Sequence, residues 1–380
     1  MGMAFPDIQR MPFKGGVCVT KRIQQIVALS LIASCLSGCT FWMTGYNYSV
    51  TPHIEDHDQT TNTMLEVKTF DDLYLVLSDS VETGRDNCIL YVSGFTETKL
   101  ERFMDIVVHN LKNLNAIGSY SIEEINYEIG TKTGRQAVAV EIIYNRTRSE
   151  ILRIKHAENM NEAKQLITTA LDKCDAKVVV QVSNYKTIDF IQMVQDYVDE
   201  NPDVCMEMPQ IAIGLYPNTG TERVIELTFT YQNSREALRN MQEKVRPIFS
   251  SAELYVSGDG NNFEKYAQLY SFLMERFEYK IETSITPAYS LLRHGVGDSK
   301  AFAIVYASMC RRADLDCKVV SGTRGGEAWC WNALNINGMY YYVDLLQCNA
   351  EGNFYLKTEH DMAGYVWDYS AFENRLPSFS

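Results

Sequence analysis

The chain has 380 residues, of which 35 are lysine or arginine and 48 are aspartate or glutamate, so its formal net charge is −13. The first 38 residues carry four basic side chains and one acidic side chain, a net charge of +3, which leaves the remainder near −16. Nucleic-acid binding requires a basic face, so this balance argues against it. It also argues against electrostatic docking on anionic lipid.

The first 38 residues have the layout of an export signal. Four basic residues precede an apolar run, residues 23–36, that is too short for a stable transmembrane helix. The run ends in Leu36-Ser37-Gly38-Cys39, which resembles the bacterial lipobox, where signal peptidase II cuts before the cysteine and the cysteine is acylated. The alternative is a plain signal peptide or signal anchor that happens to be followed by a cysteine.

The lipobox resemblance implies a lipoprotein whose mature chain begins at Cys39. Residues 1–38 would be its signal peptide, and palmitate-type acyl chains on Cys39 would hold it at the extracytoplasmic face of a cell membrane. More than one acyl chain is needed for stable attachment, because a single chain binds a bilayer only marginally. Residues 39–66 are polar and lack periodicity, so we expect a tether there.

Residues 67–250 contain a weak internal repeat. Its two copies, 67–156 and 157–250, are each predicted as an αβαββ module, and both close on a similar stretch that begins at Tyr144 in the first copy and at Tyr231 in the second. We expect helices at 70–82 and 99–114 in the first copy and at 161–173 and 188–200 in the second. The expected strands are at 88–93, 122–130, 136–144, 177–183, 205–215 and 223–231.

Residues 251–380 contain several motifs in a fixed order. A Gly-x-Gly-Asp turn, Gly295 to Asp298, is followed by Ser299 and by an apolar helix that we expect to end near Arg311-Arg312. The stretch Trp329-Cys330-Trp331-Asn332 comes next, then a hairpin signal, Asn335-Ile336-Asn337-Gly338, and then Tyr341-Tyr342-Val343-Asp344. In this order the segment resembles the transglutaminase-like core, a papain-type Cys-His-Asp fold. The predicted fold class is therefore α+β throughout: two αβαββ modules followed by a papain-like transglutaminase core.

The resemblance places the family's catalytic triad on Ser299, Trp329 and Asp344. The family has a cysteine at the first of these positions and a histidine at the second, so two of the three catalytic residues are substituted. A serine hydroxyl needs a general base within hydrogen-bond reach, and an indole N–H is a donor only. Ser299 would then lack its base, and Asp344 would have no imidazole to orient.

Two other residues are candidates for the missing chemistry. His294 lies five positions before Ser299 and could act as a substitute base, or it could be an ordinary residue of a surface turn. Cys330 could be an alternative nucleophile, but strand alternation points its side chain to the face opposite Trp329. We expect Cys330 to be a small apolar residue of the core.

Three functions follow from this pattern. The first is a surface lipoprotein with a degenerate domain that binds a peptide or cell-wall ligand without catalysis, in a groove that we expect to involve Trp329, Trp331, Gly297 and Asp298. The second is an active hydrolase or acyl transferase with Ser299 as nucleophile and an unusual base. The third is a structural spacer at the cell envelope.

Seven of the ten cysteines lie after Cys39: Cys88, Cys174, Cys205, Cys310, Cys317, Cys330 and Cys348. Their odd number and irregular spacing indicate neither a disulfide framework nor a zinc site, and no cofactor is expected. Cys310 could pair with Cys317 across the end of the helix, and Cys330 could pair with Cys348 across the hairpin.

Overall fold

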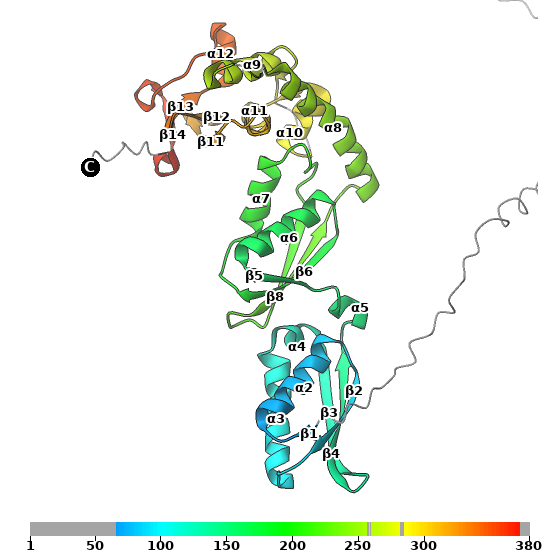
Figure 1. Ribbon diagram of the computed structural model, residues 1–380. Helices are drawn as coiled ribbons and strands as arrows, with labels where there is room; N and C mark the ends of the chain where they lie inside the picture. The colour runs from blue at the N-terminus through cyan, green and yellow to red at the C-terminus, as the bar shows by residue number, and fades with distance from the viewer. Residues whose placement is uncertain (1–65, 257, 259, 282–284, 373–380) are drawn as a thin grey trace, which may run out of the picture. The chain divides into compact units, whose positions relative to one another are not determined.

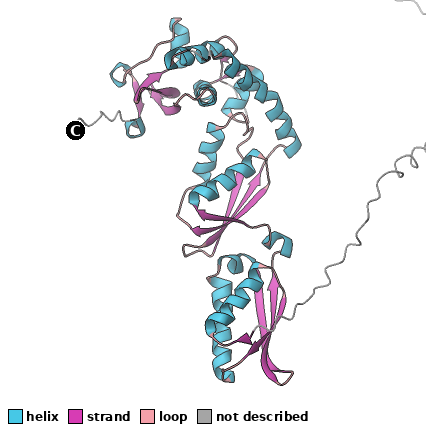
Figure 2. Ribbon diagram, in the orientation of Figure 1, coloured by secondary structure: helices cyan, strands magenta, loops and turns pink. Residues whose placement is uncertain are grey.

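The structure, a computed structural model, describes residues 66–256, 258, 260–281 and 285–372. The predicted signal peptide, the lipidation site Cys39 and nearly all of the tether lie outside these residues. Helices and strands are both present throughout the described chain (Figures 1 and 2), which confirms the predicted mixed α and β fold.

The first four-stranded sheet has the strand order β1-β2-β4-β3, with β1 parallel to β2 and the other pairs antiparallel. Helix α2 shows why the sequence forms its elements: Thr69 caps its first turn in a capping box with Asp72, and Leu73 and Leu77 bury one face. The elements of this part are β1 (Glu66–Val67), α2 (Phe70–Glu82), β2 (Asn87–Val92), α3 (Glu97–Asn113), α4 (Ala116–Ser121), β3 (Ile122–Lys132) and β4 (Arg135–Tyr144).

The second sheet has the equivalent order β5-β6-β8-β7 and the same strand directions. A short helix, α5 (Arg148–Ile151), precedes it, and its elements are β5 (Lys155–Asn159), α6 (Met160–Asp172), β6 (Lys177–Asn184), α7 (Phe190–Glu200), β7 (Gln210–Tyr216) and β8 (Arg223–Thr230). Each of the two sheets contains one strand more than the predicted αβαββ pattern. The additional strands, β1 and β5, are short and largely polar, so no alternation of apolar residues marks them in the sequence.

Two of the predicted domain boundaries fall inside elements. The boundary between residues 156 and 157 lies within β5, and the boundary between 250 and 251 lies within helix α8 (Arg235–Tyr255). Helix α8 has Ser234 as its N-cap and buries Val245 and Phe249 in the core of the C-terminal domain. This domain therefore takes part of its core from residues before position 251.

The C-terminal domain is built on an antiparallel sheet of order β13-β12-β11-β14. Asn337 and Gly338 both have positive φ, which fits the predicted hairpin turn between β12 and β13. The elements are α9 (Asn262–Met274), β9 (Glu278–Tyr279), α10 (Pro287–His294), β10 (Val296–Gly297), α11 (Ser299–Arg312), β11 (Cys317–Arg324), β12 (Glu327–Ile336), β13 (Met339–Val343), α12 (Leu345–Glu351), β14 (Tyr365–Trp367) and two 3₁₀ turns, η1 (Glu359–Asp361) and η2 (Tyr369–Phe372).

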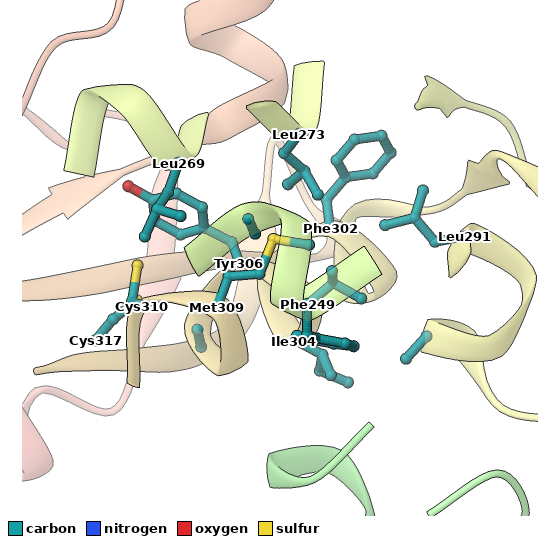
Figure 3. Close-up of a cluster of buried hydrophobic side chains, with 14 of the residues drawn as sticks. Phe249, Leu269, Leu273, Leu291, Phe302, Ile304, Tyr306, Met309, Cys310 and Cys317 are labelled. Atoms are coloured by element: carbon teal, nitrogen blue, oxygen red, sulfur yellow. The ribbon is translucent and has the colours of Figure 1, made fainter. Parts of the chain in front are cut away.

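Helix α11 is the central element of this domain. Its residues 301–310 are all buried, as expected for a helix surrounded by other elements rather than lying at a surface. Figure 3 shows Phe302 and Tyr306 of α11 among Leu269 and Leu273 of α9 and Leu291 of α10. This packing fixes the position at which α11 begins, and Ser299 is its first residue.

Candidate functional site

The turn before α11 positions Ser299. Gly295 has φ +77° and ends α10 in the left-handed region. Gly297 is required for a different reason, close packing: a Cβ there would lie 2.7 Å from the Cβ of Ala301 and 3.2 Å from that of Leu291. The turn therefore needs one glycine for its backbone angles and another for the approach of α10 to α11.

Asp298 is the N-cap of α11. Its carboxylate accepts a hydrogen bond of 2.8 Å from the backbone N–H of Ala301. We had predicted Asp298 as part of a binding groove, but its carboxylate is already used to satisfy the first turn of the helix.

Ser299 is buried, with 7% of its surface exposed. Its Oγ accepts a hydrogen bond of 3.2 Å from the backbone N–H of Cys330, which brings the start of α11 against β12 one residue from Trp329. Within the described part of the chain, no carboxylate, imidazole or amine is within hydrogen-bond distance of this hydroxyl. Ser299 is thus at the expected place, without a base.

Trp329 and Asp344 are in direct contact. The indole N–H of Trp329 donates a hydrogen bond of 2.8 Å to Oδ2 of Asp344. The structure therefore brings the second and third predicted triad positions together, with the indole as the partner of the carboxylate. A proton donor at position 329 cannot remove a proton from Ser299.

Asp344 is 3% exposed and is the hub of a hydrogen-bond network. Its Oδ2 also accepts from Nη1 of Arg324 at 3.0 Å and from the hydroxyl of Tyr365 at 2.7 Å. Its Oδ1 caps α12 by accepting from the backbone N–H groups of Leu346 and Gln347, each at 3.1 Å. Five donors surround this carboxylate, so a buried negative charge is fully hydrogen-bonded.

Trp329 is half-buried, and its ring has two neighbours that the sequence did not indicate. The ring centroid of Tyr279 lies 5.8 Å away at an interplanar angle of 48°, and the guanidinium of Arg324 lies 5.4 Å from the indole. Tyr279 is 47% exposed, and Ile281, two residues further along the chain, is 76% exposed. The exposed ring of Tyr279 therefore forms an aromatic rim beside Trp329.

Trp331 lies in a different environment from Trp329. We predicted that it would line the groove, but it is 1% exposed and packs edge-on against Tyr365 and Trp367, with ring centroids 5.0 and 5.4 Å away. The prediction that Trp331 offers a face to a ligand is therefore corrected. Strand alternation does place the two tryptophans on one face of β12, but the rings of Tyr365 and Trp367 bury the second of them.

The two substitute candidates do not complete a catalytic group. The exposed ring of His294 packs edge-on against Tyr289 of its own helix, with centroids 6.3 Å apart, and makes no hydrogen bond to Ser299. Cys330 is half-buried rather than buried, and its Sγ lies 3.5 Å from Oγ of Ser321. Burial raises the pKa of the Cys330 thiol, and this outweighs the opposing effects of Ser321 and Lys300.

All seven cysteines of the described chain are free thiols. The predicted pairing of Cys330 with Cys348 is not supported by their contacts, because the Sγ of Cys348 donates instead to the backbone oxygen of Tyr355 at 3.6 Å. In the part of the chain that the structure describes, no group of three or more His, Cys, Asp or Glu side chains is placed to hold a metal ion. No helix among the described residues has the length and apolar character that crossing a membrane requires.

Sequence reasoning missed Arg324, Tyr365 and Tyr279. These residues lie on β11, β14 and β9, and they reach the site only through the pairing of β11 with β14 and of β9 with β10. Local sequence carries no signal for such long-range pairing.

Comparison with known proteins identifies the domain. The model of the transglutaminase-like superfamily matches residues 250–366. Among solved structures, one titled as a TGase is 9% identical, with 58% of this chain and 64% of that protein covered and a TM-score of 0.26. LapG of Legionella pneumophila, in an EGTA-treated form, is 12% identical, with 36% and 73% covered and a TM-score of 0.25. This chain thus spans less than two thirds of the first of these proteins, and no curated protein matches it.

Proposed function

Residues 250–366 form a transglutaminase-like domain, and we propose that it binds a peptide or cell-wall ligand without catalysing a reaction. The single observation that carries this proposal is the hydrogen bond from the Trp329 indole to Asp344. In the thiol mechanism of this fold a histidine at that place accepts the proton of the nucleophile while the acid orients it. An indole cannot accept that proton, and Ser299 is a weaker nucleophile than a cysteine.

The rim beside Trp329 supports a binding role. Tyr279 and Trp329 provide aromatic surface next to the position where a substrate would react. Aromatic side chains with one exposed edge are suited to contacts with peptide side chains or with the apolar faces of sugars. A ligand that lies across Trp329 would therefore bury apolar surface away from water, and it would not meet a catalytic base.

We propose further that the chain is a lipoprotein anchored through Cys39 at the extracytoplasmic face of a cell membrane. The basic residues, the apolar run and the lipobox-like Leu36-Ser37-Gly38-Cys39 support this location. A cell-wall or peptide ligand is consistent with it. Replacement of Cys39 by Ala should release the chain from the membrane fraction; retention of that variant would contradict lipid anchoring.

The first test is turnover by the chain from residue 40 onward, with a Ser299→Ala variant as control. Two substrate sets are offered: glutamine-bearing proteins with a labelled amine, and cell-wall peptides. We expect no turnover by either protein. Turnover that disappears in the control would instead establish an enzyme with Ser299 as its nucleophile, and the binding proposal would be wrong.

The second test measures binding of the same peptides and cell-wall fragments by calorimetry. Trp329→Ala should weaken binding by roughly tenfold, the effect of about 1.4 kcal/mol of lost aromatic contact. Ser299→Ala should leave affinity nearly unchanged, because the hydroxyl is buried against the Cys330 backbone. Absence of binding by the unaltered chain to every member of both sets would favour a structural spacer.

A further inference from the structure

Two buried cysteines meet where helix α11 gives way to strand β11. Cys310 belongs to the last turn of the helix and is 0% exposed, and Cys317 is the first residue of the strand and is 8% exposed. Both belong to one buried hydrophobic cluster, and Figure 3 shows them next to each other at the edge of the core.

The backbone between the two cysteines holds them in this arrangement. The N–H of Leu315 donates to the carbonyl oxygen of Cys310 at 2.9 Å, which folds the connection back on the end of the helix. The hydroxyl of Tyr266 in α9 donates to the carbonyl oxygen of Asp316 at 2.8 Å, which fixes the residue just before Cys317. An ordered turn therefore connects the two cysteines and holds them beside each other in the core.

We propose that Cys310 and Cys317 form a disulfide bond when the chain folds in an oxidising compartment. The bond would covalently join α11, which begins at Ser299, to the sheet whose strand β12 carries Trp329. This modification concerns the scaffold of the site and goes beyond the proposed function, because it requires no ligand.

The reaction needs a disulfide oxidant, such as oxidised glutathione or a thiol–disulfide oxidoreductase. The thiolate of Cys317 attacks a sulfur of the oxidant and displaces one thiolate, which gives a mixed disulfide. The thiolate of Cys310 then attacks the Sγ of Cys317 and displaces the second thiolate. The two cysteines together lose two protons and two electrons, and the oxidant is reduced to two thiols.

Burial determines when this reaction occurs. Burial raises the pKa of the Cys310 thiol well above its usual range, so in the folded domain this sulfur is protonated and inaccessible. The oxidant therefore acts during folding, before α9 and α11 close over the pair. Once formed, the bond would be shielded from reductants by the same packing.

The other cysteines have neighbours that do not favour a bond in the same way. Cys330 contacts Ser321, and Cys348 donates to a backbone oxygen. Cys174 and Cys205 line a common cavity, but Nε2 of Gln242 lies 3.7 Å from the Sγ of Cys174 and occupies part of its surface. Among the cysteines that the structure describes, Cys310 and Cys317 combine neighbouring positions in the core with an ordered connecting turn.

The test uses the full chain, refolded with a mixture of reduced and oxidised glutathione. Free thiols are alkylated under denaturing conditions, and the proteolytic peptides are identified by mass spectrometry with and without prior reduction. We expect a linked peptide pair that contains Cys310 and Cys317, lower in mass than the two free peptides by two hydrogen atoms. Alkylation of both cysteines in the folded product, or their linkage to other partners, would overturn the proposal.

Two variants separate the specific bond from general oxidation. Cys310→Ser should leave Cys317 fully alkylated, and Cys88→Ser, which alters a half-buried cysteine of the first sheet, should leave the linked pair intact. The peptide map of the unaltered chain decides the proposal by itself if Cys310→Ser does not fold. Loss of ligand binding would not affect any of these results, so this proposal and the proposed function fail separately.

Discussion

Replacement of Asp344 by Asn tests whether this residue is retained for structure and not for catalysis. The change preserves the shape of the side chain and removes its charge. On Oδ2 the carboxylate accepts from Arg324, Trp329 and Tyr365, all within 3.0 Å. If the NH₂ group of the asparagine takes the place of Oδ2, it faces three hydrogen-bond donors. If it takes the place of Oδ1, it faces the two backbone N–H groups at the start of α12.

The magnitude follows from the burial of the group. Asp344 is 3% exposed, so solvent cannot replace the lost acceptor, and the guanidinium of Arg324 loses its partner. Removal of one member of a buried, hydrogen-bonded ion pair costs about 3–5 kcal/mol. The side chain of Arg324 is 36% exposed and keeps part of its hydration, so we expect roughly 3 kcal/mol, the low end of this range.

Urea unfolding followed by tryptophan fluorescence suits this prediction. The chain has four tryptophans, and three of them, Trp329, Trp331 and Trp367, lie in the C-terminal domain. Asp314→Asn is a matched control, since Asp314 is exposed and has φ +58°, a conformation that asparagine accepts. Equal unfolding midpoints for Asp344→Asn and the control would refute the view that Asp344 organises the site.

Two further predictions concern the same domain. The double variant Ser299→Cys with Trp329→His should react with iodoacetamide at position 299 far faster at pH 6 than Ser299→Cys alone. The reason is that lowering the thiol pKa by about two units from its ordinary value near 8.5 raises the thiolate fraction at pH 6 by roughly 75-fold. Identical pH profiles of the two variants would mean that position 329 does not face position 299. Gly322→Ala should destabilise the domain by about 1–3 kcal/mol, because a Cβ there overlaps the carbonyl oxygen of Val366 and lies 2.8 Å from the Trp331 ring. The control in urea unfolding is Gly130→Ala, since no atom lies within 4 Å of the Cβ added there. Equal stability of the two variants would contradict this packing around Gly322.

Helices and turns whose signals lie within a few residues of one another are predicted well from the sequence. The helix predicted over residues 70–82 coincides with α2, whose cap and apolar spacing are both visible in the sequence. The helix after Ser299 and the hairpin turn at Asn337 and Gly338 are predicted for the same reason. Each of these signals depends on neighbours within a few residues.

The surroundings of the site depend on distant residues and could not be predicted. Trp329 and Trp331 are two positions apart on one strand, yet the first is half-buried and the second is 1% exposed. The difference arises because the rings of Tyr365 and Trp367, more than thirty residues later in the sequence, pack directly on Trp331. Periodicity assigns a side chain to a face of a strand, but not to an open or covered part of that face.

The network around Asp344 also gives this aspartate a structural role that does not depend on a histidine at position 329. Of its five hydrogen-bond donors, only Trp329 occupies a catalytic position; the others are Arg324, Tyr365 and two backbone N–H groups that begin α12. In this chain the indole of Trp329 is a donor at that position, and the other four donors require the acceptor oxygens of the carboxylate whether or not a base is present. An intact aspartate in this fold is thus evidence for the architecture of the site. Evidence for catalysis has to come from positions 299 and 329, where the residues of this chain provide neither a thiol nor a base.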